Sequence, residues 1–388
     1  MNIDTTPKTM LVKRTGQWWR RGLGLALLAL LWLAPGGARA SDQVDVPGTT
    51  GSGQFGKSVT VLPNGNVVVT DPSYDIPGGA TDVGAVYLYD GVTHAQISML
   101  TGSTASDQVG SQDVVVLSNG NYVVRSLFWN DSRGAVTWGS ATSGVAGTVS
   151  AANSLVGSTT DDYVGEVVTA LSNGAYVVIS SYWDGLAANV GAATWGDGAT
   201  GVKGPVSAAN SLVGSKLNDQ VGAISAEPTD GVYELSNGNY VVICFWCDNG
   251  TIINAGAVTW GSGTSGVTGT VSAANSLMGS ANQDQVGNRG IIALSNGNYV
   301  VRSPGWDNGL EVNAGAVTWG NGATGTIGTV SATNSLVGST ANDQVGYLGV
   351  TALSNGNYVV QSWDWDNSGV IDAGAATWGD GSKSLFGN

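Results

Sequence analysis

The sequence predicts an all-β protein of six repeats, which we expect to form a six-bladed β-propeller of four-stranded antiparallel blades. A phrase close to Leu-Ser-Asn-Gly-Asn-Tyr-Val-Val recurs six times, and a second phrase, Gly-Ala-Val/Ala-Thr-Trp-Gly, recurs five times. Glycine accounts for 60 of 388 residues, as expected for short strands joined by tight turns. Repeats of ~40–60 residues with four strands each are typical of propeller blades. The turn asparagines of the first phrase are Asn64, Asn119, Asn173, Asn237, Asn296 and Asn355.

Each repeat is expected to contain four strands in a fixed order. Strand one precedes the turn, as in 349–353, and strand two follows it, as in 358–362. Asn-Gly between them predicts a two-residue hairpin in which both residues have positive φ. Strand three contains the Thr-Trp-Gly phrase (314–320), and strand four follows a glycine-rich turn (329–337). A β-helix or solenoid is the alternative architecture, but Asn-Gly hairpins do not fit rungs that wind in one direction.

The first 40 residues read as a signal peptide. A basic segment precedes the apolar run 22–34, and Ala38-Arg39-Ala40 provides the small residues of a cleavage site. We therefore expect an exported protein that is extracellular, at the cell surface or periplasmic. The expected domains are the signal peptide 1–40 and a single propeller at 41–388. Its approximate repeat units are 51–103, 104–158, 159–215, 216–280, 281–339 and 340–388.

The composition of residues 41–388 excludes some partners. This segment keeps 8 of the 14 basic residues and 27 of the 28 acidic ones, a formal net charge of −19. Such a surface repels nucleic acid and anionic lipid, because binding them requires clustered Lys and Arg. No apolar run after residue 40 approaches the ~18 residues of a membrane span. A neutral polar partner or a cation remains compatible with this charge.

The two ends of the chain suggest ring closure. The last repeat is shortened after Trp378, and its fourth-strand text is missing. The segment 44–49 resembles that text, so we expect it to pair with the last blade and leave no open sheet edge. Segment 384–387 is the alternative source of this strand.

Residues 55–90 resemble an FG-GAP repeat of the integrin-α propeller type. Phe55-Gly56 opens strand one, Asp71-Pro72 stands where Gly-Ala-Pro is usual, and Gly84-Ala85 opens strand three. The later units resemble a bacterial repeat family of unknown function found in haemagglutinin-like surface proteins. Both resemblances imply a propeller fold, and neither implies a reaction. The acidic calcium loop of many FG-GAP blades is replaced here by Ser-Asn-Gly-Asn in most units.

Few residues suggest catalysis. His94 is the only histidine, so a Ser-His-Asp triad would have to use it, and it follows no recognisable nucleophile motif. Gly-x-Gly-x-x-Gly occurs at three equivalent repeat positions between strands, which indicates a turn instead of a phosphate site. Cys244-x-x-Cys247 has no nearby histidine to complete a zinc site, so a local disulfide or two free thiols are expected. We therefore expect a protein that is not an enzyme and needs no cofactor.

Aromatic and acidic residues recur in the loop between strands two and three. Aromatic rings stack on sugars or apolar side chains, while Asp accepts hydrogen bonds from hydroxyls or binds a cation. The connection from strand four to the next strand one carries a further aspartate and should reach the same end of each blade. Alternatively, the tryptophans fill space between blades and the aspartates cap turns. The candidate ligand-binding residues are Trp129, Trp183, Asp184, Trp306, Asp307, Trp365 and Asp366.

The last loop also resembles a calcium loop. Oxygen-bearing side chains alternate at Asp364, Asp366 and Ser368, with Asp372 beyond, but the bidentate Glu of such loops is missing. Calcium is thus a possible ligand here, and the other side chains predict no metal.

The functional expectation is a secreted or cell-surface binding or adhesion module whose ligand is a glycan or a protein. Two alternatives are a carbohydrate-active propeller enzyme, hydrolase or lyase, and a purely structural repeat of a surface array. The residues do not name the ligand, the oligomeric state or a surface anchor, nor do they say whether the chain is a fragment of a longer repeat protein.

Overall fold

The computed structural model describes residues 43–223 and 231–387, so the expected signal peptide lies outside the described residues. The repeats lie in the compact unit Val46–Asn388. Its described residues are all-β except for one turn of helix, α1 (Trp129–Ser132). Asn130 and Asp131 within α1 have positive φ, so this segment is a loop turn and not a regular helix. No described helix is long and apolar enough to cross a membrane.

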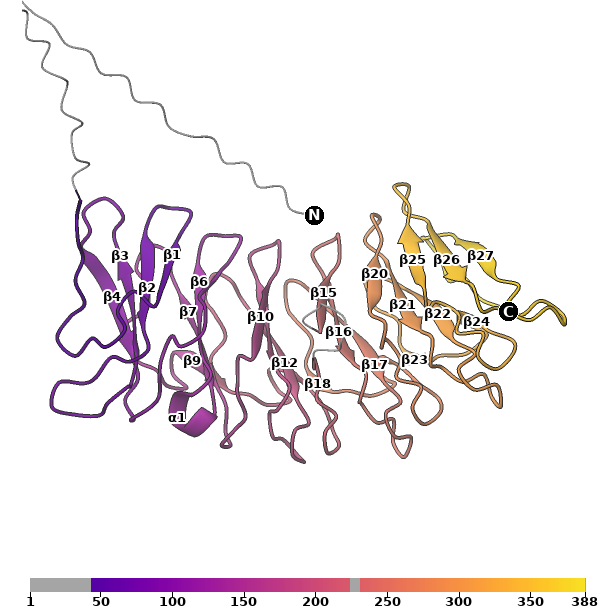
Figure 1. The fold of residues 1–388 in the computed structure, drawn as a ribbon, viewed down its shortest axis with the longest axis horizontal. Helices are drawn as coiled ribbons and strands as arrows, with labels where there is room; N and C mark the ends of the chain where they lie inside the picture. The colour runs from indigo at the N-terminus through magenta and orange to yellow at the C-terminus, as the bar shows by residue number, and fades with distance from the viewer. Residues whose placement is uncertain (1–42, 224–230, 388) are drawn as a thin grey trace, which may run out of the picture. The chain divides into compact units, whose positions relative to one another are not determined.

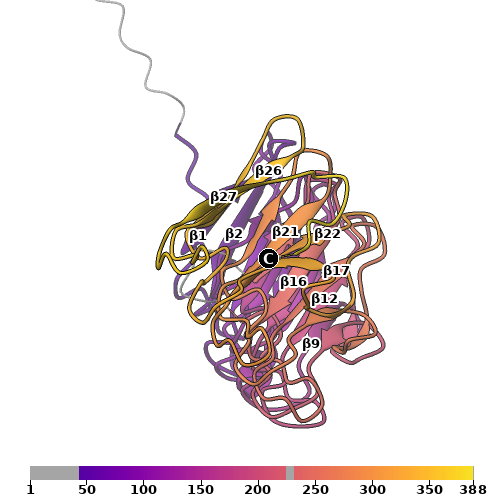
Figure 2. The same cartoon turned by 90° about the vertical axis from the view of Figure 1, so that its right-hand side faces the viewer.

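The strands form six consecutive sheets, one for each repeat, which lie side by side in chain order (Figures 1 and 2). The first sheet contains β1 (Ser58–Val61), β2 (Val67–Asp71), β3 (Ala85–Tyr89) and β4 (Gln96–Thr101). The second contains β5 (Val115–Val116), β6 (Tyr122–Ser126), β7 (Ala135–Gly139) and β9 (Ser154–Val156). The third contains β10 (Val167–Ala170), β11 (Tyr176–Ser180), β12 (Ala192–Gly196) and β14 (Leu212–Val213).

The remaining three sheets follow the same order. The fourth contains β15 (Val232–Glu234), β16 (Tyr240–Cys244), β17 (Ala257–Gly261) and β19 (Leu277–Met278). The fifth contains β20 (Ile291–Ala293), β21 (Tyr299–Ser303), β22 (Ala316–Gly320) and β24 (Ser335–Val337). The sixth contains only β25 (Gly349–Ala352), β26 (Tyr358–Ser362) and β27 (Ala375–Gly379). The predicted fold class is confirmed, since the chain is all-β and its six mostly four- to five-stranded sheets fit the six blades.

The predicted fourth strand is wrong in one respect, because the structure divides it in two. In the fourth repeat unit, β18 (Gly269–Thr270) leaves its own sheet and pairs in parallel with β14 of the preceding sheet. The chain then turns at Asn275, whose side chain accepts a hydrogen bond from the Ser272 amide and donates one to the Thr270 carbonyl. This turn ends the strand that the sequence pattern predicted as continuous. The equivalent short strands are β8 (Gly147–Thr148), β13 (Gly204–Pro205) and β23 (Gly328–Thr329).

The Asn-Gly hairpins also differ from the prediction. Only the glycine has positive φ, +89° at Gly120, whereas both residues were expected to have it. The Gly120 amide donates to the Leu117 carbonyl, which is the pattern of a three-residue loop ending in a left-handed glycine. The side-chain nitrogen of Asn119 can therefore donate a hydrogen bond outside its own hairpin.

Neighbouring sheets are joined by a shared backbone acceptor. The Gly198 carbonyl of the third repeat accepts hydrogen bonds from the side chains of Asn119, Asn121 and Trp138, at 2.8, 2.9 and 2.9 Å. Gly322 and Gly381 repeat this arrangement with three donors each, and Gly263 with Asn173 and Trp195. Between the sheets, a buried tyrosine of each later repeat packs into the apolar core, as Tyr240 and Tyr299 do. The Thr-Trp-Gly tryptophans thus join consecutive blades.

The prediction that 44–49 pairs with the last sheet is wrong. No strand forms there, and the Thr49 hydroxyl lies 3.1 Å from that of Tyr87 in the first sheet. At the other end, Gly387 pairs in parallel with Leu336 of the fifth sheet, where a Gly-Thr strand would lie in other repeats. Among the described strands, pairing joins each sheet only to a neighbour in chain order, so ring closure stays a prediction.

Candidate functional site

Two loops meet at the end opposite the Asn-Gly hairpins in the second to sixth sheets, and a buried aspartate holds them together. In the third repeat, Asp162 is fully buried. Its Oδ2 accepts hydrogen bonds from the Ser158 and Thr159 amides at 2.7 and 2.8 Å. Its Oδ1 accepts one from the Asp184 amide at 2.9 Å. A single carboxylate therefore fixes the connection between strands four and one to the loop between strands two and three.

The same link occurs in five repeats, so the predicted meeting of the two loops at one end is confirmed. In each, the aspartate accepts hydrogen bonds from two amides of its own loop and from one amide of the other loop. The pairs are Asp107 with Asn130, Asp162 with Asp184, Asp219 with Asp248, Asp284 with Asp307, and Asp343 with Asp366.

Burial and hydrogen bonds oppose each other at these carboxylates. Burial raises the pKa of Asp162, Asp219 and Asp284 above the ordinary value of 3.8, although the amides that bond them act in the other direction. Burial also acts to raise the pKa of Asp343, but hydrogen bonds led by those from Thr340 outweigh it and lower the pKa. Their oxygens are occupied by backbone donors, which is the arrangement of a structural link.

The predicted ligand-binding aspartates bond within their own loop. Oδ1 of Asp184 accepts a hydrogen bond from the Asn189 amide at 2.8 Å, and Oδ1 of Asp307 accepts one from the Asn313 amide at 2.8 Å. Asp366 bonds the Asp372 amide in the same way. Each of these three aspartates is partly exposed. They stabilise turns in which Asn189, Asn313 and Asp372 have positive φ.

The predicted tryptophans anchor the loops. Trp183 is 7% exposed and Trp306 is 3% exposed, and both belong to the apolar cores between sheets. The Trp306 indole also donates to the Ser280 hydroxyl at 3.2 Å. Trp129 and Trp365 are partly buried and pack against the cores next to them. Their burial leaves Trp183 and Trp306 little ring surface for a ligand.

Exposed aromatic rings lie beside these anchors, and the sequence interpretation missed them. Phe128 and Tyr182 each directly precede a loop tryptophan and are 39% and 43% exposed. Trp363, two residues before Trp365, is 56% exposed. The Tyr182 ring makes an edge contact with Tyr163 from the other loop, with centroids 6.1 Å apart. Adjacent residues leaving a strand point to opposite sides, a signal that could have separated the anchor from its exposed neighbour.

A small groove lies farther along the same end. This groove lies beside Arg289 and has a volume of about 200 Å³. It is lined by Asn288, Pro304 and Tyr347 among others. The Arg289 guanidinium lies over the Tyr347 ring, 4.6 Å from its centroid. An exposed ring beside a cation and amide groups offers stacking and hydrogen bonding together.

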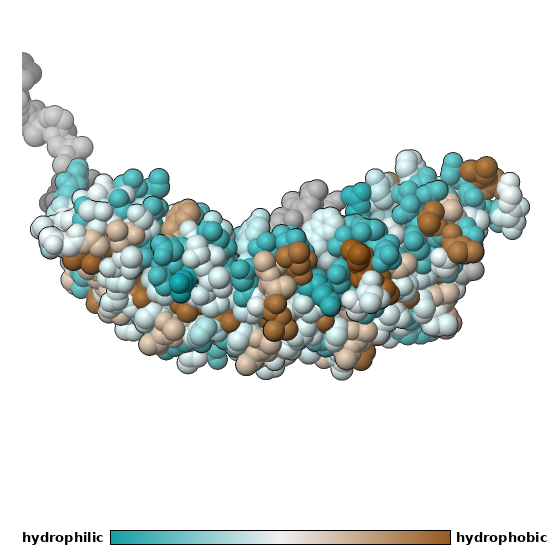
Figure 3. All heavy atoms as spheres, turned by 90° about the horizontal axis from the view of Figure 1, so that it is seen from below, coloured by the Kyte–Doolittle hydropathy of each residue, from teal (hydrophilic) through white to brown (hydrophobic). Residues whose placement is uncertain are grey.

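The surface seen from below Figure 1, the side on which α1 lies, is mixed in character. Figure 3 shows hydrophobic residues in small groups separated by hydrophilic ones, without one continuous apolar patch. Small separate apolar groups among polar residues suit contact with a polar ligand better than burial against an apolar protein surface.

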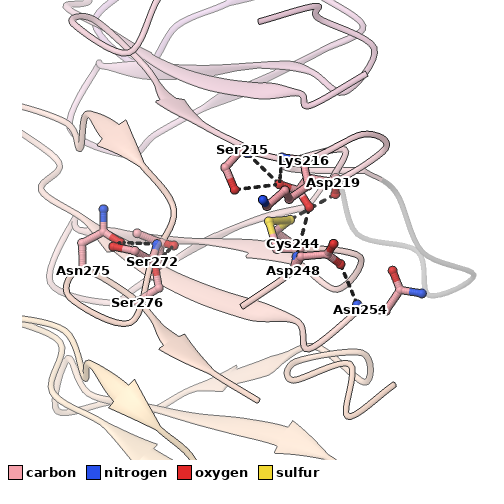
Figure 4. The surroundings of a disulfide bond; sticks show 11 residues. Ser215, Lys216, Asp219, Cys244, Asp248, Asn254, Ser272, Asn275 and Ser276 are labelled. Carbon is pink, nitrogen blue, oxygen red and sulfur yellow. Dashed lines mark hydrogen bonds between the residues drawn. A yellow bond between two sulfur atoms is a disulfide. The ribbon is translucent and has the colours of Figure 1, made fainter. Parts of the chain in front are cut away.

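The two cysteines form a disulfide beside one of the aspartate links. Cys244 ends β16 and Cys247 occupies the position of the loop tryptophan, and both are buried. Figure 4 shows the bridge next to Asp219 and Asp248. The Cys244 sulfur lies 3.1 Å from the Asp219 carbonyl oxygen. In this repeat the disulfide takes the anchoring role that Trp183 and Trp306 have elsewhere.

The weak calcium candidate does not form a ligand cluster. Among the described residues, no three His, Cys, Asp or Glu side chains come together in a way that could hold a metal ion. Asp364, Asp366 and Asp372 belong to this set, and Ser368 is exposed. His94 lies far from this end, in a groove on the first sheet with Gly91 and Val67.

Comparison with solved structures gives only distant likenesses. A structure described as the Dos1 propeller shares 10% identity and a TM-score of 0.31 over 80% of this chain and 64% of that one. Hsv2 of Kluyveromyces lactis shares 9% identity and a TM-score of 0.29 over 78% of this chain and 69% of that one. The chain thus spans less than two thirds of the first of these structures. No curated protein matches the chain.

A family of repeats matches six times along the sequence. The matched segments are 61–111, 116–166, 170–223, 234–288, 293–347 and 352–388. Each begins at the end of strand one of its repeat, the first five run into the following connection, and together they cover most of the chain. No catalytic family is indicated by this match. The protein belongs to the family described as a repeat of unknown function, DUF5650.

Proposed function

We propose that this protein is an exported, non-catalytic binding module that contacts a glycan or a protein through the loop end of its blades. One observation carries the proposal. Exposed rings at Phe128 and Tyr182 stand at equivalent positions of adjacent sheets, on loops fixed by buried aspartates. A rigid loop presents its ring without an ordering cost on binding, which favours affinity.

Export is supported by the signal-like residues 1–40 and by the disulfide Cys244–Cys247, because disulfides persist in oxidising compartments. Adhesion at a cell surface, and the finer likeness to FG-GAP or haemagglutinin-like repeats, belong to this proposal as well. The ligand contact is assigned to the exposed neighbours of the anchoring tryptophans. The proposal also keeps direct ligand contacts from five predicted residues, the partly buried Trp129 and Trp365 and the aspartates Asp184, Asp307 and Asp366.

A carbohydrate-active enzyme is the less favoured alternative. Acid–base catalysis needs a carboxyl group that is free to exchange a proton with substrate. The buried Asp162, Asp219 and Asp284 have both oxygens bonded to backbone amides. Such carboxylates suit structural links better than catalysis.

A glycan array probed with the secreted protein tests the proposal. Replacing Phe128 and Tyr182 together by Ala should weaken binding about 10- to 100-fold, because each ring contributes roughly 1 kcal/mol of contact. The matched control replaces Val92 and Ile327, exposed apolar residues near the hairpin end, by Ala. An equal loss in the control, or unchanged binding by the Phe128/Tyr182 variant, would contradict the assignment. Release of sugar from any bound glycan would favour the enzyme alternative.

A further inference from the structure

The outer face of the sixth sheet presents an interface without its partner. Trp138, Trp195, Trp260 and Trp319 each donate a hydrogen bond to a glycine carbonyl of the following repeat. Trp378 occupies the same strand position in β27 and is 67% exposed. Burying an indole of this size is a substantial source of stability, so its exposure marks an unused contact.

The edge of β27 is open as well. In the four preceding sheets, the threonine before the tryptophan bonds a serine of the fourth strand, as in Thr318 and Ser335 at 2.7 Å. The sixth sheet has no fourth strand among the described residues, and β27 pairs only with β26. Ala376 is exposed on the same face as Trp378, whereas the equivalent Val317 is buried in the core between the fifth and sixth sheets.

The outer face of the first sheet has a groove at the place where a preceding tryptophan would lie. The groove has a volume of about 310 Å³ and is mostly apolar, with Val67, Val69 and Tyr89 in its wall. Gly91 and His94 also line it. Gly91 stands at the repeat position of Gly198, whose carbonyl accepts the tryptophan hydrogen bond between the second and third sheets.

The first sheet differs from later ones in the side chains that line this groove. Val67 replaces the tyrosine that other repeats bury against the preceding sheet, such as Tyr176. His94 replaces the glycine that touches the preceding tryptophan; an added Cβ at Gly201 would lie 2.5 Å from the Trp138 Cβ. Tyr89 in turn stands at the position of Gly196, which packs against the Tyr176 ring. An indole entering the groove therefore meets Val67, Tyr89 and His94 where interior tryptophans meet tyrosine and two glycines.

We propose that two copies of this chain associate head to tail, with Trp378 of one copy inserted into the groove of the first sheet of the other. The contact continues the interface that joins consecutive repeats within the chain, so its donor and acceptor are already in place. Trp378 could fill the groove of its own chain or that of a second copy. A second copy is favoured, because Trp378 and the groove are both uncovered within one molecule. Such a heterologous contact adds further copies in one direction and gives rings or filaments.

The charge of the protein predicts how the association responds to salt. Each copy carries an acidic net charge of −19 over residues 41–388, so two copies repel each other at low ionic strength. Salt screens this repulsion and leaves the apolar contact intact. The association should therefore strengthen as salt is added, the reverse of an interface held by opposite charges.

Sedimentation of the secreted protein over a concentration series tests the proposal. The expected result is a mass that rises from monomer to dimer and larger species, more so at high salt. Trp378→Ser should return the protein to monomer, while Trp363→Ser, which removes an exposed tryptophan of the same sheet at the loop end, should not. His94→Gly should strengthen the association, since it removes the imidazole from the entry of the groove. Thermal melts of each variant establish that it is folded.

Three outcomes would overturn the proposal. A wild-type protein that stays monomeric to millimolar concentration at high salt excludes it. So does an associating protein whose mass is unaffected by Trp378→Ser. If the monomer protects Trp378 from acrylamide quenching, the chain closes on its own first sheet and the partner is not a second copy.

Discussion

At the scale of single residues, the position of each loop aspartate could be predicted, whereas its role could be narrowed only to ligand contact or the capping of a turn. The sequence places Asp162 and Asp184 in two loops that meet, as the structure confirms. The spacing of residues does not show that backbone amides occupy Asp162, because that depends on how deeply the loop is buried. The same holds for the loop aromatics. Trp183 and its neighbour Tyr182 are both aromatic, so residue type does not show that the first is buried and the second exposed.

Replacing one linking aspartate tests its structural role. Asp284→Asn should lower the free energy of unfolding at pH 7 by about 1–3 kcal/mol, because an amide cannot accept from the amides of both loops at once. Urea unfolding measures this change. Asp161→Asn, at an exposed position beside Asp162, is the control and should be neutral. Wild-type stability in Asp284→Asn would argue against the link.

The raised pKa of Asp162, Asp219 and Asp284 also predicts a pH dependence. A carboxyl group whose pKa is higher in the folded than in the unfolded chain favours folding when it is protonated. Its contribution is fully present below the ordinary pKa of 3.8 and is lost as the pH rises through the raised value. Acidification through this window should therefore stabilise the protein through these groups. Urea unfolding of the wild type at pH 7 and within the window checks the sign, and Asp284→Asn should show a smaller dependence.

At the scale of elements, strand two was predicted with the observed bounds Tyr358–Ser362, while strand four was not. A run of consecutive apolar residues after Asn-Gly defines strand two locally. The short strand β18 pairs with the preceding sheet, a tertiary contact that no local pattern reports. The hairpin type was missed for a related reason, because Asn119 forms an ordinary turn that lets its side chain reach Gly198 of the next repeat.

Two glycines of the fourth sheet should respond differently to substitution. A Cβ at Gly238 would meet nothing within 4 Å, so Gly238→Ala costs only the strain of a left-handed alanine, about 1 kcal/mol. A Cβ at Gly263 would lie 1.8 Å from the Gly238 carbonyl oxygen, so Gly263→Ala should cost about 2–3 kcal/mol or more. Chemical unfolding compares the two. A larger loss at Gly238 would contradict the packing described.

The disulfide should contribute modestly to stability because it closes a short loop. Cys244 and Cys247 are three residues apart, for which loop closure predicts a stabilisation of about 2 kcal/mol. Unfolding with and without reductant should reveal a difference of this size. A variant with both cysteines replaced by Ala should show no effect of reductant.

At the scale of the whole molecule, the number of repeats and the all-β class were predictable because the phrases recur almost unchanged. Ring closure could not be predicted from the recurring phrases. It depends on whether the first and sixth sheets meet, and the interior repeats carry no information about that. The divergent ends do carry some, since Val67, His94 and Trp378 are the positions at which the terminal sheets differ in sequence or exposure from the interior ones.

The uncovered sixth sheet should be the least protected part of the repeat array. Strands such as Tyr358–Ser362 lack a neighbouring sheet on one side, whereas Tyr240–Cys244 lies between two. Local opening is easiest where the fewest apolar contacts are lost. Hydrogen exchange of dilute protein should therefore be faster in peptides from β26 than in those from β16. Equal protection of the two would imply that something covers the sixth sheet.

In each junction, a glycine carbonyl of one repeat accepts hydrogen bonds from side chains of the preceding repeat. This uniform junction determines how such a chain can change in length. Asn237 and Asn296 are 59 residues apart, as are Asn296 and Asn355, and each junction uses the same donors and acceptor. Excising residues 238–296 would bring the Gly322 carbonyl to the indole of Trp195 in place of that of Gly263. No new junction chemistry is needed, so unequal recombination between copies of the repeat can shorten or lengthen the protein in whole steps without first breaking its fold.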